Sequence, residues 1–248
     1  QTTNEKYTFR TWLLRLGLFL YDHIGGRRKL PPTRTVDLAK HPAGAPLRPG
    51  FGTGFEYSDG WVDDARLVVL NAKDAAERGA AVRTHTRVEG ASRDAEGWLI
   101  RTTDGTFRAR ALVNAAGPGV LAVEGLLGDA PDYAMRLVRG SHIVVPGLFD
   151  HPYAYFFQLP DGRIFFAIPY ERDFTLIGTT DADYKGDPGA VAITPAETDY
   201  LLKAASSYFN RDLTHADLCW AYSGVRALYD NGASSAQETT RDYVLALD

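Results

Sequence analysis

Residues 153–168 read YAYFFQLPDGRIFFAI, two aromatic-rich runs on either side of a Pro-Asp-Gly segment. Aromatic residues favour strands, whereas Pro, Asp and Gly favour turns. The stretch therefore predicts two antiparallel strands, Tyr153–Leu159 and Ile164–Ile168, joined by a tight turn.

Strand patterns continue on both sides of this hairpin, at Arg136–Val145, Phe174–Thr180 and Cys219–Val225. Thr194 and Glu197 have the spacing of a capping box, with Pro at the first helical position, so we expect a helix that runs to about Tyr208. The C-terminal half is thus expected to be a broad antiparallel sheet with one helix.

The N-terminal half mixes helix and strand signals. Asp63 can cap a helix over residues 63–78, which Gly79 ends, and residues 31–54 are rich in Pro and Gly and predict a long ordered loop. Further strands are expected at Ala81–Val88, Trp98–Thr103 and Phe107–Asn114, the last two flanking an Asp-Gly turn.

This order predicts an α/β (α+β) chain of two interleaved parts and excludes a simple doubly wound sheet, because the strands come in hairpins. We expect one domain to comprise residues 1–61 and 121–222 and the other residues 62–120 and 223–248.

Composition narrows the class of protein. The 248 residues are 45% hydrophobic and carry 27 basic and 31 acidic side chains, a net charge of −4, which argues against a nucleic-acid partner. The single cysteine, Cys219, excludes an internal disulfide and a Cys-based metal site, and no metal is expected.

The apolar stretch Trp12–Ile24 has helical spacing and is too short to span a bilayer. It is interpreted as a helix packed on its own core. The alternative is a helix lying on a membrane surface, which the basic residues at 27–29 favour.

Small residues end the apolar run at 111–113, in the sequence Asn114-Ala115-Ala116-Gly117-Pro118. Such residues let a backbone approach a flat or phosphorylated ligand closely, although tight turns after strands are also common.

Several segments together resemble one family: FEYSDGWVDDARL (55–67), NAAGP (114–118), GSHIVVP (140–146), IGTTD (177–181) with YKGDP (184–188), and YSGVR (222–226). They are similar, in order and spacing, to the FAD-dependent, quinone-linked glycerol-3-phosphate dehydrogenases. The resemblance runs from about Leu13 to the end of the chain. It implies a fold of the D-amino-acid-oxidase type, in which an FAD domain is interleaved with an antiparallel substrate sheet. It also implies the conversion of glycerol 3-phosphate to dihydroxyacetone phosphate, with electrons passing to FAD and then to the quinone pool.

The resemblance assigns catalytic roles to His142 and Arg226. A histidine can take the hydroxyl proton as hydride leaves the same carbon, and a guanidinium can hold a phosphate or stabilise an oxyanion. The alternative for His142 is a structural histidine whose hydrogen bonds are made inside the sheet, and the alternative for Arg226 is a structural salt bridge.

Other positions are expected to support the cofactor or the substrate. Cofactor contacts are expected at Arg87, Val88, Asn114, Ala115, Ala116, Gly117 and Gly224. Substrate-side support is expected from Tyr57, Asp59, Thr179, Thr180 and Asp181, for which structural turn or packing roles are the alternative.

The Gly-rich phosphate turn of such FAD domains does not occur in the chain, because Gly50, Gly52 and Gly54 follow a Pro-rich loop and open no helix. We therefore expect the chain to be an inactive core of a longer enzyme, with weak FAD binding by itself. The alternatives are an oxidase of the same family and a non-catalytic binding or assembly module. The expected location is the cytoplasm, and peripheral attachment to the inner face of the cytoplasmic membrane is an open alternative. Whether the protein forms a homodimer is also open.

Overall fold

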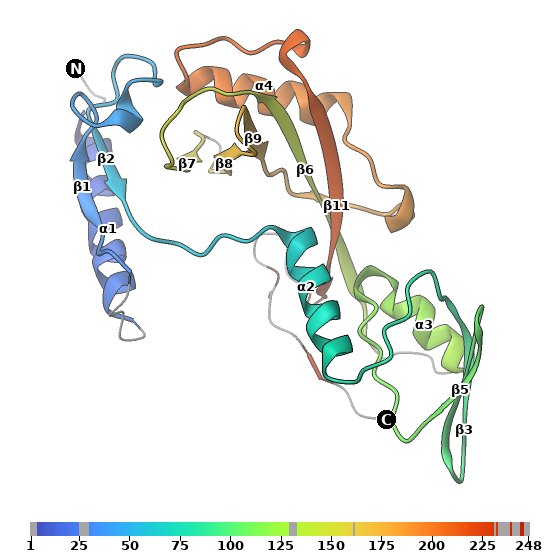
Figure 1. The fold of residues 1–248 in the computed structure, drawn as a ribbon. Coiled ribbons are helices and arrows are strands. Elements are labelled where there is room, and N and C mark those ends of the chain that lie inside the picture. The colour runs from blue at the N-terminus through green and yellow to red at the C-terminus, as the bar shows by residue number, and fades with distance from the viewer. Residues whose placement is uncertain are drawn as a thin grey trace. The chain divides into compact units, whose positions relative to one another are not determined.

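The computed structural model describes residues 4–24, 30–128, 133–160 and 162–230 and the single positions 232, 239, 244 and 245. These residues form two compact units, 1–82 and 83–248. Each unit is described by itself (Figure 1).

The first unit contains two helices and a short strand pair. Its elements are α1 (Asn4–His23), β1 (Arg34–Asp37), the 3-10 turn η1 (Pro42–Gly44), β2 (Thr53–Glu56) and α2 (Asp64–Glu77). The prediction of a loop throughout 31–54 is wrong, because β1 and β2 pair antiparallel in that region. Arg34 lies opposite Glu56 in this pair and forms an ion pair with it at 2.8 Å, which helps to set the register.

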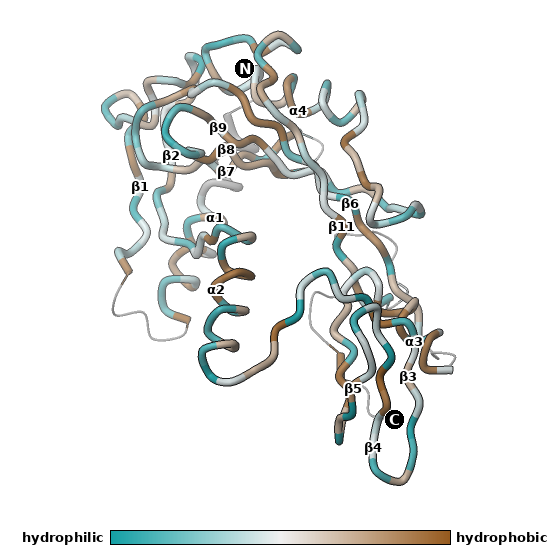
Figure 2. The backbone as a smooth tube through the Cα atoms, turned by 45° about the vertical axis from the view of Figure 1, so that its right-hand side comes forward, coloured by the Kyte–Doolittle hydropathy of each residue, from teal (hydrophilic) through white to brown (hydrophobic). Residues whose placement is uncertain are grey.

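Helix α2 confirms the helix expected after Asp63, whose side chain accepts a hydrogen bond from the Arg66 amide at 3.1 Å. The middle of α2 is strongly apolar (Figure 2). Four consecutive side chains there are 45–66% exposed: Leu67, Val68, Val69 and Leu70.

The second unit begins with a three-stranded meander and a short helix. These are β3 (Val88–Asp94), β4 (Gly97–Thr102), β5 (Gly105–Ala109), the 3-10 turn η2 (Gly117–Gly119) and α3 (Val120–Leu127), which packs against β3. Strand β4 confirms the expected strand at 98–103.

Two strand predictions in this region are wrong. Residues 81–87 form no strand, and the strand expected at 107–114 ends at Ala109. Neither segment joins a ladder in the described part of the chain, and His85 in the first segment has a φ of 56°, outside the extended range of a strand. Val113, at the end of the second segment, is 83% exposed.

The main sheet confirms the antiparallel expectation. It is built from β6 (Met135–Pro146), β7 (Tyr155–Gln158), β8 (Ile164–Tyr170), β9 (Phe174–Gly178), β10 (Ala182–Asp183) and β11 (Trp220–Tyr229). The order is β10-β6-β9-β8-β7, and β11 also pairs with β6, along ten residues. The expected division at residue 222 falls inside β11.

Helix α4 (Pro195–Tyr208) covers one face of this sheet, and the expected capping box of Thr194 and Glu197 is present. Two short 3-10 turns flank it, η3 (Pro188–Ala190) and η4 (His215–Asp217). The core lies between α4 and the sheet. Its fully buried large side chains include Ile143, Phe165, Ile177, Leu201 and Phe209.

We expect Phe165→Ala to lower the free energy of unfolding by about 3–5 kcal/mol, because it removes a fully buried ring from this core. Phe156→Ala is the matched control: Phe156 lies on the adjacent strand and is 47% exposed, so its loss should cost about 1 kcal/mol. Urea unfolding of the full-length protein measures both. Equal losses would contradict the placement of Phe165 in the core.

Candidate functional site

Strand pairing brings His142 and Arg226 onto one face of the main sheet. In the β6–β11 ladder His142 lies opposite Tyr222, Gly140 opposite Gly224, and Val138 opposite Arg226. Alternate residues of a strand share a face, so these six positions line the same side of the sheet. Tyr222 and Arg226 are four residues apart on β11, which corresponds to about 13 Å along the strand.

The two glycines leave a strip of bare backbone between His142 and Arg226, called the glycine strip below. A Cβ atom at Gly224 would meet nothing within 4 Å. A Cβ atom at Gly140 would lie 2.9 Å from Thr179 Oγ1 and 3.3 Å from Arg226 Nη2. At Gly140 the strip is therefore covered by a hydroxyl and a guanidinium, whereas at Gly224 the backbone is open to a flat group.

The imidazole of His142 is held between two strands. On one side its ring stacks on Tyr222, with the ring centroids 5.1 Å apart and the planes at 10°. On the other side His142 pairs with Gly178 of β9, where a Cβ atom would lie 2.1 Å from His142 Cδ2. No side chain fits at position 178 while the imidazole occupies this place.

Arg226 forms an ion pair with Asp181, in the turn that follows β9, with Nη1 and Oδ1 2.5 Å apart. Thr179, in the same turn, donates its hydroxyl hydrogen to the Thr180 carbonyl at 2.9 Å. The structure thus brings Thr179 and Asp181 to the border of the glycine strip.

The Thr180 side chain belongs to a polar network under the sheet, on the α4 side. Its hydroxyl accepts from the Ser141 amide at 3.0 Å and donates to Glu197 Oε1 at 2.9 Å. Glu197 Oε1 also accepts from Ser141 Oγ, and Glu197 Oε2 pairs with Arg139 Nη2 at 3.0 Å. Ser141 Oγ lies 2.8 Å from Ser223 Oγ of β11. One carboxylate thereby joins α4, β6 and the turn after β9.

The pKa of Glu197 reflects two opposing causes. Burial raises it, but the hydrogen bonds from Thr194, Thr180 and Ser141 together outweigh the burial and lower the pKa below its usual 4.5. The carboxylate is therefore held in its charged form.

The turn at Asn114–Gly117 leads into η2, which lies against β11, the strand that carries Gly224 and Arg226. Asn114 donates to the Val120 carbonyl and to Glu124, and its Oδ1 accepts from the Ala116 amide at 3.3 Å. Ala115 is exposed, and Gly117 has a positive φ of 54°, which favours glycine. The Asn114 side chain thus shapes the turn.

The remaining predicted positions have other surroundings within their own units. Both the amide and the carbonyl of Arg87 bond to Thr103, and Val88 begins β3. Tyr57 and Asp59 belong to the first unit, where Asp59 accepts from the Tyr21 hydroxyl at 3.3 Å. Burial, followed by the charge of Asp59, raises the pKa of Tyr57.

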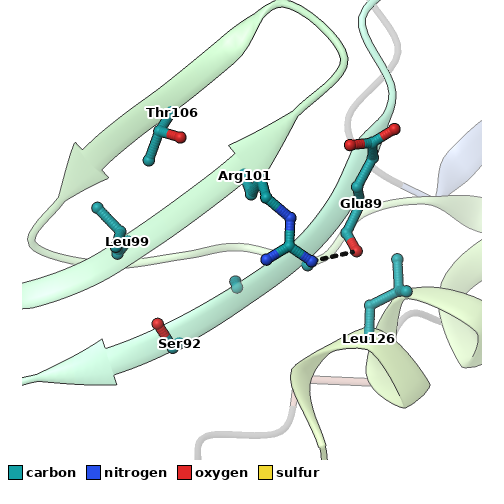
Figure 3. A pocket seen from close by; sticks show the side chains of 8 residues that line it. Glu89, Ser92, Leu99, Arg101, Thr106 and Leu126 are labelled. Carbon is teal, nitrogen blue, oxygen red and sulfur yellow. Dashed lines mark hydrogen bonds between the residues drawn. The ribbon is translucent and has the colours of Figure 1, made fainter.

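A cavity of about 220 Å³ lies elsewhere in the second unit, beside the meander and α3 (Figure 3). Its lining includes Glu89, Ser92, Leu99, Arg101, Thr106 and Leu126, and none of the glycine-strip residues. Arg101 donates to the Glu89 carbonyl within it, at 3.4 Å. In the described part of the chain, no cluster of three His, Cys, Asp or Glu side chains could hold a metal ion.

Two residues of the site were missed by the sequence analysis. Glu197 was recognised only as a helix cap, and Tyr222 only as part of a motif. The alternation of Tyr222 and Gly224 in the expected strand Cys219–Val225, with Arg226 directly after it, was an available signal, because it places the three positions on one face of a continuing strand.

Comparisons with known proteins point to one group. A family described as FAD dependent oxidoreductase matches residues 8–247. D-erythritol 1-phosphate dehydrogenase of Brucella abortus is 48% identical over 96% of the chain and 49% of the relative. The aerobic glycerol-3-phosphate dehydrogenase of Escherichia coli is 44% identical over 94% of the chain and 48% of the relative.

A solved structure agrees with these relatives. The glycerol-3-phosphate dehydrogenase from Bacillus halodurans complexed with FAD superposes with a TM-score of 0.64 at 33% identity, over 75% of this chain and 39% of that chain. The chain thus spans about half the length of the curated relatives it matches.

We expect Glu197→Gln to lower the free energy of unfolding by about 3 kcal/mol near pH 7, because it leaves Arg139 without its charged partner. The lowered pKa of Glu197 means that its contribution is complete above pH 4.5 and is lost as the pH falls through the folded-state pKa. The difference from wild type should therefore shrink toward about pH 3.

Urea unfolding of the full-length protein at the two pH values measures this difference. Glu77→Gln, on the exposed surface of α2, is the control and should have little effect. A difference that is the same at both pH values would contradict the assigned role of the carboxylate.

Proposed function

The chain belongs to the FAD-dependent oxidoreductase family, and on this premise we propose that the protein oxidises glycerol 3-phosphate to dihydroxyacetone phosphate. The observation that carries the proposal is the placement of His142 and Arg226 on one sheet face, on either side of the glycine strip. The names of relatives at 44–48% identity support a polyol phosphate as the substrate.

The residues of the strip fit the cofactor that defines the family. A Cβ atom at Gly140 would enter the space between Thr179 and Arg226, and the space above Gly224 is open. Backbone without side chains suits close contact with a flat ring. FAD, when bound, supplies the acceptor for the hydride that leaves the substrate carbon. We propose that Gly224 and the turn at 114–117 contact it.

The proposed roles of the protein's own residues are proton abstraction and substrate binding. His142 takes the proton of the hydroxyl group that is oxidised, because a neutral imidazole is a base near neutral pH. Arg226, oriented by Asp181, binds the phosphate or stabilises the oxyanion through its N–H groups. Thr179 offers a hydroxyl at the same border.

We further propose that the electrons pass to quinone at a membrane surface, to which α1 attaches. Seven apolar side chains on and just after α1 are at least 40% exposed: Trp12, Leu13, Leu14, Leu16, Phe19, Leu20 and Ile24. Among the described residues, no helix is long and apolar enough to cross a membrane. An exposed apolar helix of this kind can lie in the bilayer interface.

A second candidate substrate is D-erythritol 1-phosphate, because the relative that carries this name is 48% identical to the chain. Each phosphate ester is added without oxygen to the full-length protein loaded with FAD, and loss of the flavin absorbance is recorded. The faster reductant identifies the substrate. A bound flavin that neither compound bleaches would contradict the proposed function.

We expect His142→Ala to lower kcat by about 100-fold or more with little change in KM, because proton transfer matters mainly in the transition state. His215→Ala is the control, since His215 forms an exposed ion pair with Asp199. Steady-state rates with an artificial electron acceptor measure both variants. An unchanged kcat in His142→Ala would remove this residue from the mechanism.

For membrane attachment, we expect the double variant Leu13→Glu and Leu20→Glu to bind vesicles of anionic lipid at least about tenfold more weakly, because two apolar contacts are lost. Phe174→Ser, an exposed apolar position on β9, is the control. Vesicle co-sedimentation of the full-length protein measures binding. Equal binding by the double variant and wild type would exclude α1 as the attachment site.

A further inference from the structure

Tyr222 has a contact with His142 that the proposed mechanism does not use. The two residues are directly opposite each other in the β6–β11 ladder, and their rings stack at 5.1 Å with nearly parallel planes. Such a stack restricts how the imidazole can turn about its side-chain bonds.

Tyr222 also contacts a second aromatic ring. Its ring centroid lies 5.2 Å from that of Trp220, two residues earlier on the same face of β11. Trp220, Tyr222 and His142 thus form a row of three rings. Trp220 is 56% exposed and Tyr222 36%, so the row lies at the surface of the sheet.

On its β9 side the imidazole lies over the backbone of a glycine. Gly178 lies there, and the ring occupies the space that a Cβ atom would fill. The imidazole is therefore confined by backbone on the β9 side and by an aromatic face on the β11 side. Of these two contacts, only the one with the aromatic face can be removed by changing a side chain.

We propose that Tyr222 is a positioning residue that holds the His142 imidazole in the orientation needed for proton abstraction. This inference rests on the proposed function, in which His142 is the base. Tyr222 acts through its ring face, so its hydroxyl is dispensable. A base that leaves its productive geometry by about 1 Å can lose about 100-fold in rate.

The test compares three substitutions in the full-length protein loaded with FAD. Tyr222→Phe keeps the ring and should retain kcat within about threefold, whereas Tyr222→Leu should lower kcat by about 10- to 100-fold with KM changed less than about threefold. Tyr222→Met is a second variant without a ring, for use if the Leu variant folds poorly by circular dichroism. The matched control is Tyr229→Leu, at the other end of β11, where the Tyr229 ring stacks with Tyr133.

A second readout does not depend on turnover. Histidine labelled with ¹³C at Cε1 reports ring-current shifts by NMR, and His142→Gln assigns the His142 signal. The signal should stay in place in Tyr222→Phe and Tyr229→Leu and should move in Tyr222→Leu and Tyr222→Met.

Two kinetic results would overturn the proposal: full kcat in the folded Leu or Met variant, or an equal loss in Tyr222→Phe, which would assign the role to the hydroxyl group. An unmoved His142 signal in the folded Leu or Met variant would also overturn it. If wild-type protein is not reduced by any polyol phosphate, the proposed function fails, and the NMR comparison still decides whether Tyr222 holds the imidazole.

Discussion

The continuous pairing of β6 with β11 is the constraint on which the site depends. Ten residues of each strand are in register, from Met135 opposite Tyr229 to Val144 opposite Trp220. A slip of one residue would move every side chain of β11 to the other face. His142 and Arg226 would then lie on opposite sides of the sheet, and the serine pair under the strip would be broken.

The two faces of this ladder do different work. One carries His142, Tyr222, Arg226 and the two glycines. The other carries Ser141 and Ser223, which contact each other and, through Ser141, the part-buried Glu197 carboxylate. Because that carboxylate also binds Thr180, the position of α4 is tied to the turn that carries Asp181, and through it to the Arg226 guanidinium. The polar network is thus structural support for a face it does not touch.

The sequence correctly predicted the elements that depend only on residues close to one another in the chain. The capping box of Thr194 and Glu197, the aromatic hairpin of β7 and β8, and the Asp104-Gly105 turn depend on residues close in sequence, and all three are present. Residues 81–87 and 110–113 have strand-like composition, but neither segment joins a ladder among the described residues, because composition does not say whether a neighbouring strand is in place. The stack of His142 on Tyr222 joins residues 80 positions apart. The sequence of either segment alone does not determine which residue of the other strand lies opposite it.

The bare backbone at Gly178 has an evolutionary consequence. A larger residue at position 178 would clash with the imidazole. The clash disappears only if His142 is replaced first, and that replacement removes the imidazole from the site. Drift at the two positions is therefore coupled. In a combinatorial library, larger residues at position 178 should be recovered only together with a much smaller residue at position 142, a pattern of epistasis between two neighbouring strands that neither position would reveal by itself.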